Sequence, residues 1–223
     1  MREAVFPRAG AAAGVLSVIL TFAGFGLHGG LPDSTSAAAV RSYVEHVSAR
    51  QAGIGNYLEL LGYVLFLVFA AFLYAVARVK SSARLNWLPI LALVSATAYV
   101  ALSAAAIAAQ QVIVEWARAG ADPKTVLGVY ILDDEAFTLS FELAALFLAA
   151  LGLAVLPWQG MLRLIGIAAL AVAAIVFLSG LIGTASIDSG ISQLAFVLFV
   201  LWTLASAIYL LIRPVRVASS PTP

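Results

Sequence analysis

The chain has 223 residues, of which 63% are hydrophobic and only 10% carry charge. A soluble domain needs far more charge to cover its surface, so lipid must be the solvent for most of this chain. The formal net charge of +1 argues against the concentrated basic face that nucleic acid requires. With no cysteine in the sequence, disulfides, thiol nucleophiles and cysteine-ligated metals are excluded.

Six apolar stretches are each long enough to cross a bilayer. A helix rises about 1.5 Å per residue, so roughly 20 residues cross about 30 Å of hydrocarbon. Backbone polar groups in lipid are satisfied only in helices and closed barrels, and these stretches are too long and uniformly apolar for barrel strands. The N-terminal stretch exceeds a secretory signal core, so it is interpreted as the first span. We expect an all-α polytopic bundle, one transmembrane domain over 1–223, with spans at about 9–28, 53–77, 87–112, 129–156, 163–183 and 191–212.

Charge is distributed unequally between the two ends of these spans. Eight of the twelve Lys and Arg residues fall at the end that carries both termini, and ten of the eleven acidic residues fall at the other end. Basic residues are retained on the cytoplasmic side of membranes. The sequence therefore predicts a multi-pass protein of the cell membrane with both termini in the cytoplasm.

The outer end is predicted to carry a small helical cap. A helix over about 34–50 is expected after the N-capping candidates Asp33, Ser34 and Thr35. It is amphipathic, because Val40, Tyr43, Val44 and Val47 recur at helical spacing opposite a charged face. Helical sequence also continues past the third span to Arg118. The Ala-Gly-Ala-Asp-Pro stretch at 119–123 then predicts the turn of a projecting helical hairpin.

Polar residues recur at the outer ends of the spans. His28, Glu59 and Gln193 lie 20, 19 and 20 residues from the inner arginines Arg8, Arg78 and Arg213, and so about 30 Å away. Glu142 lies 16 residues from Trp158, or about 24 Å, and is therefore about one turn deeper. Further polar residues share helix faces at this height: Asn56 and Tyr63 with Glu59, Thr138 and Glu135 with Glu142, and Gln111 beside Gln110.

Two carboxyl groups in a low-dielectric site can share one proton, so that one donates while the other accepts. The leading hypothesis is a metal-independent enzyme of isomerase, cyclase or epoxide-opening type. It would act on an apolar small molecule from the outer leaflet, without a cofactor. Its catalytic candidates are Glu59, Glu142, Asp134 and Asp188, and its substrate-binding candidates are His28, Asn56, Tyr63, Gln111, Thr138 and Gln193.

Other hypotheses remain open at this stage. The same carboxyls could carry protons in a small proton-coupled transporter or solute-binding membrane protein. The protein could also be an accessory subunit of a membrane complex. An interfacial Glu can simply reach water, and acidic residues near Asp133 can serve only to favour a helix N-terminus. No metal site is expected from two distant histidines, and no H-E-x-x-H, G-x-S-x-G or glycine-rich phosphate loop occurs.

The chain also resembles a known group of proteins in three stretches. These are Arg-Gln-Ala-Gly-Ile-Gly-Asn-Tyr-Leu-Glu-Leu-Leu-Gly at 50–62, Ala-Ala-Ala-Val-Arg-Ser-Tyr-Val at 37–44, and Pro-Trp-Gln-Gly-Met-Leu-Arg-Leu-Ile-Gly at 157–166. They look like an uncharacterised bacterial six-helix membrane family that is common in actinobacteria. The resemblance covers most of the chain, implies a six-helix fold with Glu59 at the family's acidic position, and implies no function. This chain has glutamate where the family pattern has aspartate, and Asp133-Asp134-Glu135 is denser in acid than that pattern.

Overall fold

The computed structural model describes residues 5–29, 36–80, 85–183 and 189–213, and over these ranges it is helical without strands. All the described helices except α2 are long and apolar enough to cross a membrane, which makes six candidate spans. The predicted all-α fold with six spans is confirmed, and the chain is an integral membrane protein. The helices are α1 (Val5–His28), α2 (Ala37–His46), α3 (Ala49–Lys80), α4 (Trp87–Arg118), α5 (Pro123–Val155), α6 (Met161–Gly183) and α7 (Ser189–Ile212).

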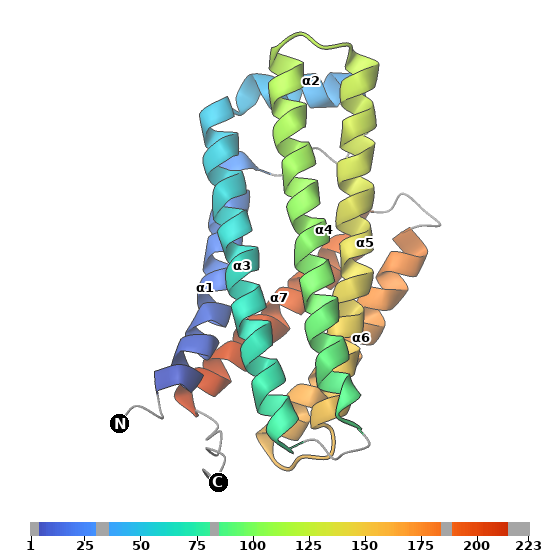
Figure 1. Cartoon of the computed structure of the whole chain (residues 1–223). Helices are drawn as coiled ribbons and strands as arrows, with labels where there is room; N and C mark the ends of the chain where they lie inside the picture. The colour runs from blue at the N-terminus through green and yellow to red at the C-terminus, as the bar shows by residue number, and fades with distance from the viewer. Residues whose placement is uncertain (1–4, 30–35, 81–84, 184–188, 214–223) are drawn as a thin grey trace.

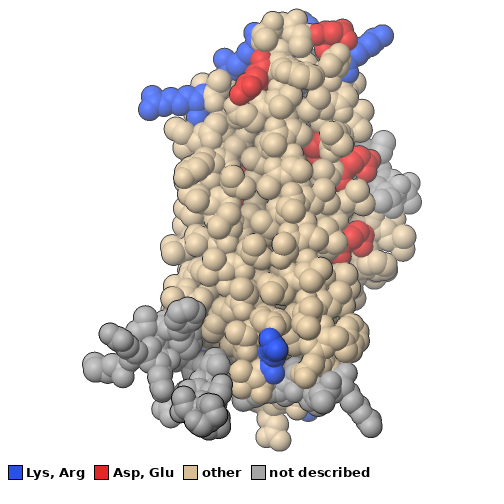
Figure 2. Space-filling model, in the orientation of Figure 1, with Lys and Arg blue, Asp and Glu red and all other residues tan. Residues whose placement is uncertain are grey.

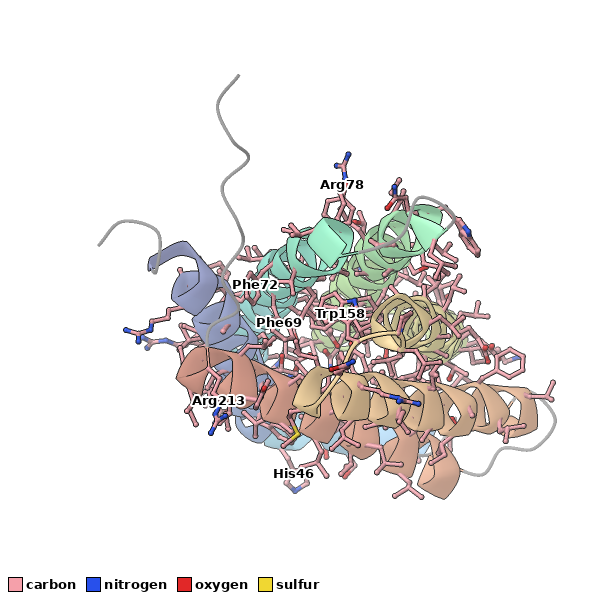
Figure 3. The ribbon with its side chains drawn as sticks, turned by 90° about the horizontal axis from the view of Figure 1, so that it is seen from below. His46, Phe69, Phe72, Arg78, Trp158 and Arg213 are labelled. Atoms are coloured by element: carbon pink, nitrogen blue, oxygen red, sulfur yellow. The ribbon has the colours of Figure 1, made fainter. Side chains whose placement is uncertain are left out.

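The six long helices form a closed ring in chain order. Helix α1 packs on α3, each later helix packs on the one before it, and α7 returns to pack on α1. Helices α1, α3, α4 and α5 run side by side, whereas α6 and α7 are inclined across them (Figure 1; Figure 3 shows the same from below). The start of α1 and the end of α7 lie at the same end of the bundle (Figure 1). We call this the inner end.

Aromatic side chains fill the centre of the ring. The Phe66 ring of α3 meets the rings of Tyr99 on α4, Phe147 on α5 and Phe199 on α7 at centroid separations of 5.4–5.5 Å, all edge to face. Aromatic quadrupoles favour this arrangement over face-to-face stacking. Four helices are thereby joined at one level of the core.

The inner end separates apolar from charged side chains. Seen from below in Figure 3, Phe69 and Trp158 are directed into the bundle, while Arg78 and Arg213 extend outward. Arginines at the ends of α3 and α7 suit a headgroup layer, where a charged tip reaches water and its stem stays in lipid.

Helices α3, α4 and α5 project beyond the other spans at the outer end. They contain 32, 32 and 33 residues, against 24, 23 and 24 for α1, α6 and α7. At about 1.5 Å per residue they are roughly 48–50 Å long, well over the 30 Å or so of hydrocarbon. The turn between Arg118 and Pro123 closes the predicted hairpin, with Gly120 at φ +76°. Helix α2 crosses this projecting end and packs against α4 and α5 (Figure 1).

The amphipathic helix is shorter than the predicted 34–50. Its N-cap is Ser36, whose hydroxyl accepts from the backbone N–H of Ala39 at 3.1 Å, and it ends at His46. Ser48 and Gln51 then form a reciprocal capping box, because each side chain accepts from the backbone N–H of the other at 3.1 Å. This box starts α3 at Ala49. Residues 33–35, the predicted N-caps, lie outside the described residues.

Candidate functional site

A buried ion-pair candidate joins the end of α1 to the outer part of α3. The Nε2 atom of His28 is hydrogen-bonded to Oε1 of Glu59. Both side chains are almost fully enclosed, with 1% of His28 and 3% of Glu59 exposed. By helix rise the pair lies about 30 Å from the inner arginines, at the outer edge of the hydrocarbon. Both residues were predicted from the sequence to be site residues at this height, but a hydrogen bond between them was not predicted.

Two glycines make room for this pair. A Cβ on Gly24 of α1 would lie 2.6 Å from Cγ of Glu59, and a Cβ on Gly55 of α3 would lie 2.6 Å from Cδ2 of His28. Each glycine also faces the backbone carbonyl of the other, within 2.6–2.9 Å of such a Cβ. Small residues at a helix crossing let two backbones approach closely in a membrane. The close approach of α1 and α3 therefore seats the two ionisable side chains.

Helix α4 contributes two consecutive amides to the same region. Nε2 of Gln110 lies 3.4 Å from Nδ1 of His28, so both ring nitrogens of the histidine have a partner. The next residue, Gln111, accepts from Nδ2 of Asn56 at 3.2 Å and donates from its own Nε2 to Glu115 at 2.8 Å. Asn56 lies one turn before Glu59 on α3. The predicted binding residues Asn56 and Gln111 therefore lie in contact with each other, and Gln110 is the more direct neighbour of the histidine.

Tyr43 of α2 and Asp133 of α5 complete the region from above. Burial, and then the negative charges of Glu59 and Asp133, raise the pKa of Tyr43 to about 12. Asp133 itself interacts electrostatically with Glu59, His28 and Asp134. We call this set the outer polar cluster; it contains His28, Tyr43, Asn56, Glu59, Gln110, Gln111 and Asp133. Five helices contribute to it.

Two atoms in the outer polar cluster retain hydrogen-bonding capacity. The hydroxyl oxygen of Tyr43 and Oδ1 of Asn56 are buried without a partner among the described residues. Most buried polar atoms in proteins are paired. Their position beside the His28–Glu59 pair leaves the cluster able to accept a further small polar group.

A small cavity lies one to two turns beneath the pair. It has a volume of about 30 Å³, and its lining comes from α1, α3, α4 and α7. Tyr63, one turn below Glu59 on α3, lines it together with the hydroxyl-bearing residues Ser17, Thr21 and Thr203. The Tyr63 ring also packs edge to face on Tyr99 at 5.6 Å. The predicted binding residue Tyr63 is therefore a wall of the bundle interior.

Glu142 does not join the outer polar cluster. Its carboxylate lies against Gly180 of α6, where the missing side chain leaves space for it. The Glu59 side chain instead faces α1. The expectation that Glu59 and Glu142 meet in one hollow is therefore corrected. The order of the helices in the ring turns the Glu142 side of α5 toward α6. The depth of a residue within its span does not reveal this direction.

The remaining predicted site residues fall in different places. Asp134 is exposed on α5, and Thr138 is half-buried one turn further along the same helix. Gln193 lies near the start of α7, and Asp188 lies outside the described residues. Figure 2 shows acidic side chains at the outer end and down one flank of the bundle. Of the predicted catalytic acids that the structure describes, Glu142 lies apart against Gly180, whereas Asp134 interacts electrostatically with Asp133, which in turn interacts with Glu59.

Three cluster members were not selected as site residues from the sequence. Tyr43 could have been identified from the sequence, because it lies on the apolar face of the amphipathic helix and such a face packs against other residues. Gln110 could have been identified less directly, as a second amide side chain next to Gln111. Asp133 was interpreted as part of an acidic helix start. Among the described residues no group of three or more His, Cys, Asp or Glu side chains could hold a metal ion.

The class that fold and site define is an integral membrane protein with a buried ionisable pair at its outer end. A scan against protein-family models found no match, and searches of curated proteins and of solved structures found none either.

Proposed function

We propose that this protein is a small proton-coupled membrane transporter in which the His28–Glu59 pair binds and releases the coupled proton. The observation that carries the proposal is the burial of this pair between α1 and α3 within a membrane bundle. Ionisable side chains in spans are rare because ionised groups are costly in lipid, and they commonly mark ion or proton pathways.

A histidine and a glutamic acid that share a hydrogen bond can take up and release one proton as a unit. Without an extra proton the pair carries one net negative charge, and with it the pair is neutral overall. Asp133 interacts with both members, so the charge of the pair is also linked to α5. A change in proton number would then alter the attraction between three helices.

Geometry favours this transporter hypothesis over an enzyme acting through paired carboxyls. The enzyme required Glu59 and Glu142 to work together, but they face α1 and α6 respectively.

The proposed direction of access is from the outer side. The pair lies near the outer hydrocarbon edge, and α2, whose Tyr43 interacts electrostatically with Glu59, crosses the outer end of the bundle (Figure 1). Under the positive-inside rule this side is extracytoplasmic and both termini are cytoplasmic. Protons would reach the pair past α2, and the solute would cross as the ring rearranges.

Proton flux in vesicles tests the proposal. Purified protein is reconstituted into liposomes that contain a fluorescent pH indicator, and a membrane potential is set with potassium and valinomycin. Small amines, weak acids, amino acids and lipophilic cations are then added as separate solute classes. We expect at least one class to drive proton movement in the wild type, and Glu59→Gln and His28→Gln to abolish it.

Glu142→Gln provides the matched control, because it removes an intramembrane carboxyl outside the outer polar cluster. It is expected to keep proton movement at the wild-type level. Wild-type vesicles that behave like protein-free vesicles with every solute class would contradict the proposal. So would undiminished flux in correctly folded Glu59→Gln and His28→Gln variants.

A further inference from the structure

The partner of Nδ1 on His28 determines how easily the pair can change its proton number. Nε2 of His28 faces Glu59 and Nδ1 faces the side-chain amide of Gln110, 3.4 Å away. In the unprotonated pair the ring is neutral and Nε2–H donates to the Glu59 carboxylate. Nδ1 is then a bare acceptor, and the Gln110 N–H₂ group can donate to it.

When the pair gains one proton, Nδ1 no longer needs a hydrogen-bond donor and needs an acceptor instead. The protonated pair is either an imidazolium beside a carboxylate or a neutral ring that accepts from the Glu59 hydroxyl. Nδ1 carries a hydrogen in both forms, and it then needs an acceptor. The amide oxygen of Gln110 can provide one if the terminal amide turns over by about 180°, a rotation that exchanges its nitrogen and oxygen.

We propose that Gln110 is the positioning residue that lets the His28–Glu59 pair hold or release a proton, by donating to Nδ1 in one state and accepting from it in the other. Glutamine suits this position because its terminal amide has an N–H₂ donor and a C=O acceptor at the same distance along the side chain, so that either can meet Nδ1. An acceptor-only or donor-only side chain satisfies one state and leaves a buried polar group unpaired in the other. The inference rests on the proposed function for its purpose, but proton number and tautomer can be measured without transport.

The other groups near His28 are fixed charges or neutral partners. Glu59 faces the ring from α3, Asp133 acts on it from α5 with Asp134 nearby, and Tyr43 lies above them on α2. Helix α4 brings Gln110, while Gln111 is engaged with Asn56 and Glu115. Among these neighbours Gln110 is the one that meets Nδ1 of the ring, and its amide can present either a donor or an acceptor there.

Nitrogen-15 NMR of the imidazole provides the test. The chain has two histidines, so His46→Asn leaves His28 as the single labelled ring. The ¹⁵N shifts distinguish a hydrogen on Nδ1, on Nε2 or on both. We expect hydrogen on Nε2 alone at high pH and the appearance of hydrogen on Nδ1 as pH falls.

Two substitutions of Gln110 are expected to move this transition in opposite directions. Gln110→Glu supplies only an acceptor and should raise the midpoint by at least about one pH unit, a tenfold gain in proton affinity. Gln110→Lys supplies only a donor and a positive charge, and should lower the midpoint by at least a similar amount. Thr97→Val is the control on the same helix, at an exposed position outside the outer polar cluster, and it should leave the midpoint unchanged.

Several outcomes would overturn the inference. The two Gln110 variants could shift the midpoint in the same direction, neither could shift it, or Thr97→Val could shift it as much. If the Gln110 variants do not fold, wild-type behaviour in the His46→Asn background decides: hydrogen on Nδ1 at high pH contradicts the assignment, and hydrogen on Nε2 supports it. If the NMR results hold but vesicles move no protons, the inference stands and the transporter proposal fails.

Discussion

Gly24 of α1 and Gly55 of α3 face each other and each accommodates the ionisable side chain of the opposite helix. A Cβ on Gly24 would lie 2.6 Å from the Glu59 side chain, and one on Gly55 would lie 2.6 Å from the His28 ring. Both contacts are shorter than real Cβ atoms show. The glycines and the ionisable pair are therefore one structural unit, although 31 residues separate the two chain segments.

Gly55→Ala is expected to destabilise the protein and displace His28. Alanine favours a helix over glycine by about 0.5–1 kcal/mol, but overpacking costs about 1–3 kcal/mol, so the steric effect should win. Thermal unfolding in detergent measures the difference. Gly53→Ala, two residues away with no atom within 4 Å of its Cβ, is the matched control and should be neutral or stabilising. Equal effects of the two substitutions would contradict the close-approach model.

The raised pKa of Tyr43 predicts that the folded protein loses stability in strongly alkaline solution. Burial and nearby acids raise its pKa from 10.0 to about 12 in the folded chain. A raised pKa favours the protonated form in the folded state, so this stabilisation is fully present below about pH 10 and is lost as pH rises to about 12. The absorbance difference between wild type and Tyr43→Phe should show phenolate forming near pH 12.

The melting temperature of Tyr43→Phe should fall less than that of the wild type over this interval. Tyr57→Phe, at a position that is 61% exposed, controls for the general effect of removing a phenol. A Tyr43 phenolate that forms near pH 10 would place this side chain in solvent and not over the pair.

Glu142 and Gly180 should show energetic coupling. A methyl group at position 180 would occupy the site of the Glu142 carboxylate and force it toward lipid. Gly180→Ala should therefore destabilise the wild type more than it destabilises Glu142→Ala, with a coupling energy of at least about 0.5 kcal/mol. Chemical unfolding of the wild type, the two single variants and the double variant in mixed micelles measures it. An equal cost of Gly180→Ala in both backgrounds would show that the two residues do not share this space.

Membrane orientation can be tested with single cysteines, because the natural chain has none. Lys124→Cys lies at the outer hairpin and Arg78→Cys near the inner end. In intact bacterial cells a membrane-impermeant maleimide should label position 124 and reach position 78 only after permeabilisation. The reverse pattern would invert the proposed topology while leaving the fold unchanged.

The sequence predicts the spans well because hydrocarbon imposes a length. All six predicted spans coincide with described helices, and the hairpin turn falls at 119–122, where an Ala-Gly-Ala-Asp stretch precedes Pro123. The amphipathic helix was predicted too long because its end depends on Ser48 and Gln51, which form a capping box for the next helix. That Ser-x-x-Gln pattern is visible in the sequence, but it competes with continued helical periodicity.

The site was predicted only in part because depth along a helix does not determine direction around it. His28 and Glu59 were placed at one height, and their bonding depends on how closely α1 and α3 approach at Gly24 and Gly55. Glu142 was predicted to lie about one turn deeper, and its carboxylate faces α6. Which neighbour a side chain meets is decided by the order of helices in the ring, and a single sequence does not display that order.

The contact between α1 and α7 has a consequence for biogenesis. Among the described spans α1 is synthesised first and α7 last, and each other span can settle against the one made just before it. Until α7 arrives, Ser17 and Thr21 lack the partner wall that Phe196, Phe199 and Thr203 later provide. A chain stalled after its fifth span would expose these hydroxyls to acyl tails, so membrane chaperones and proteases could distinguish it from a finished copy.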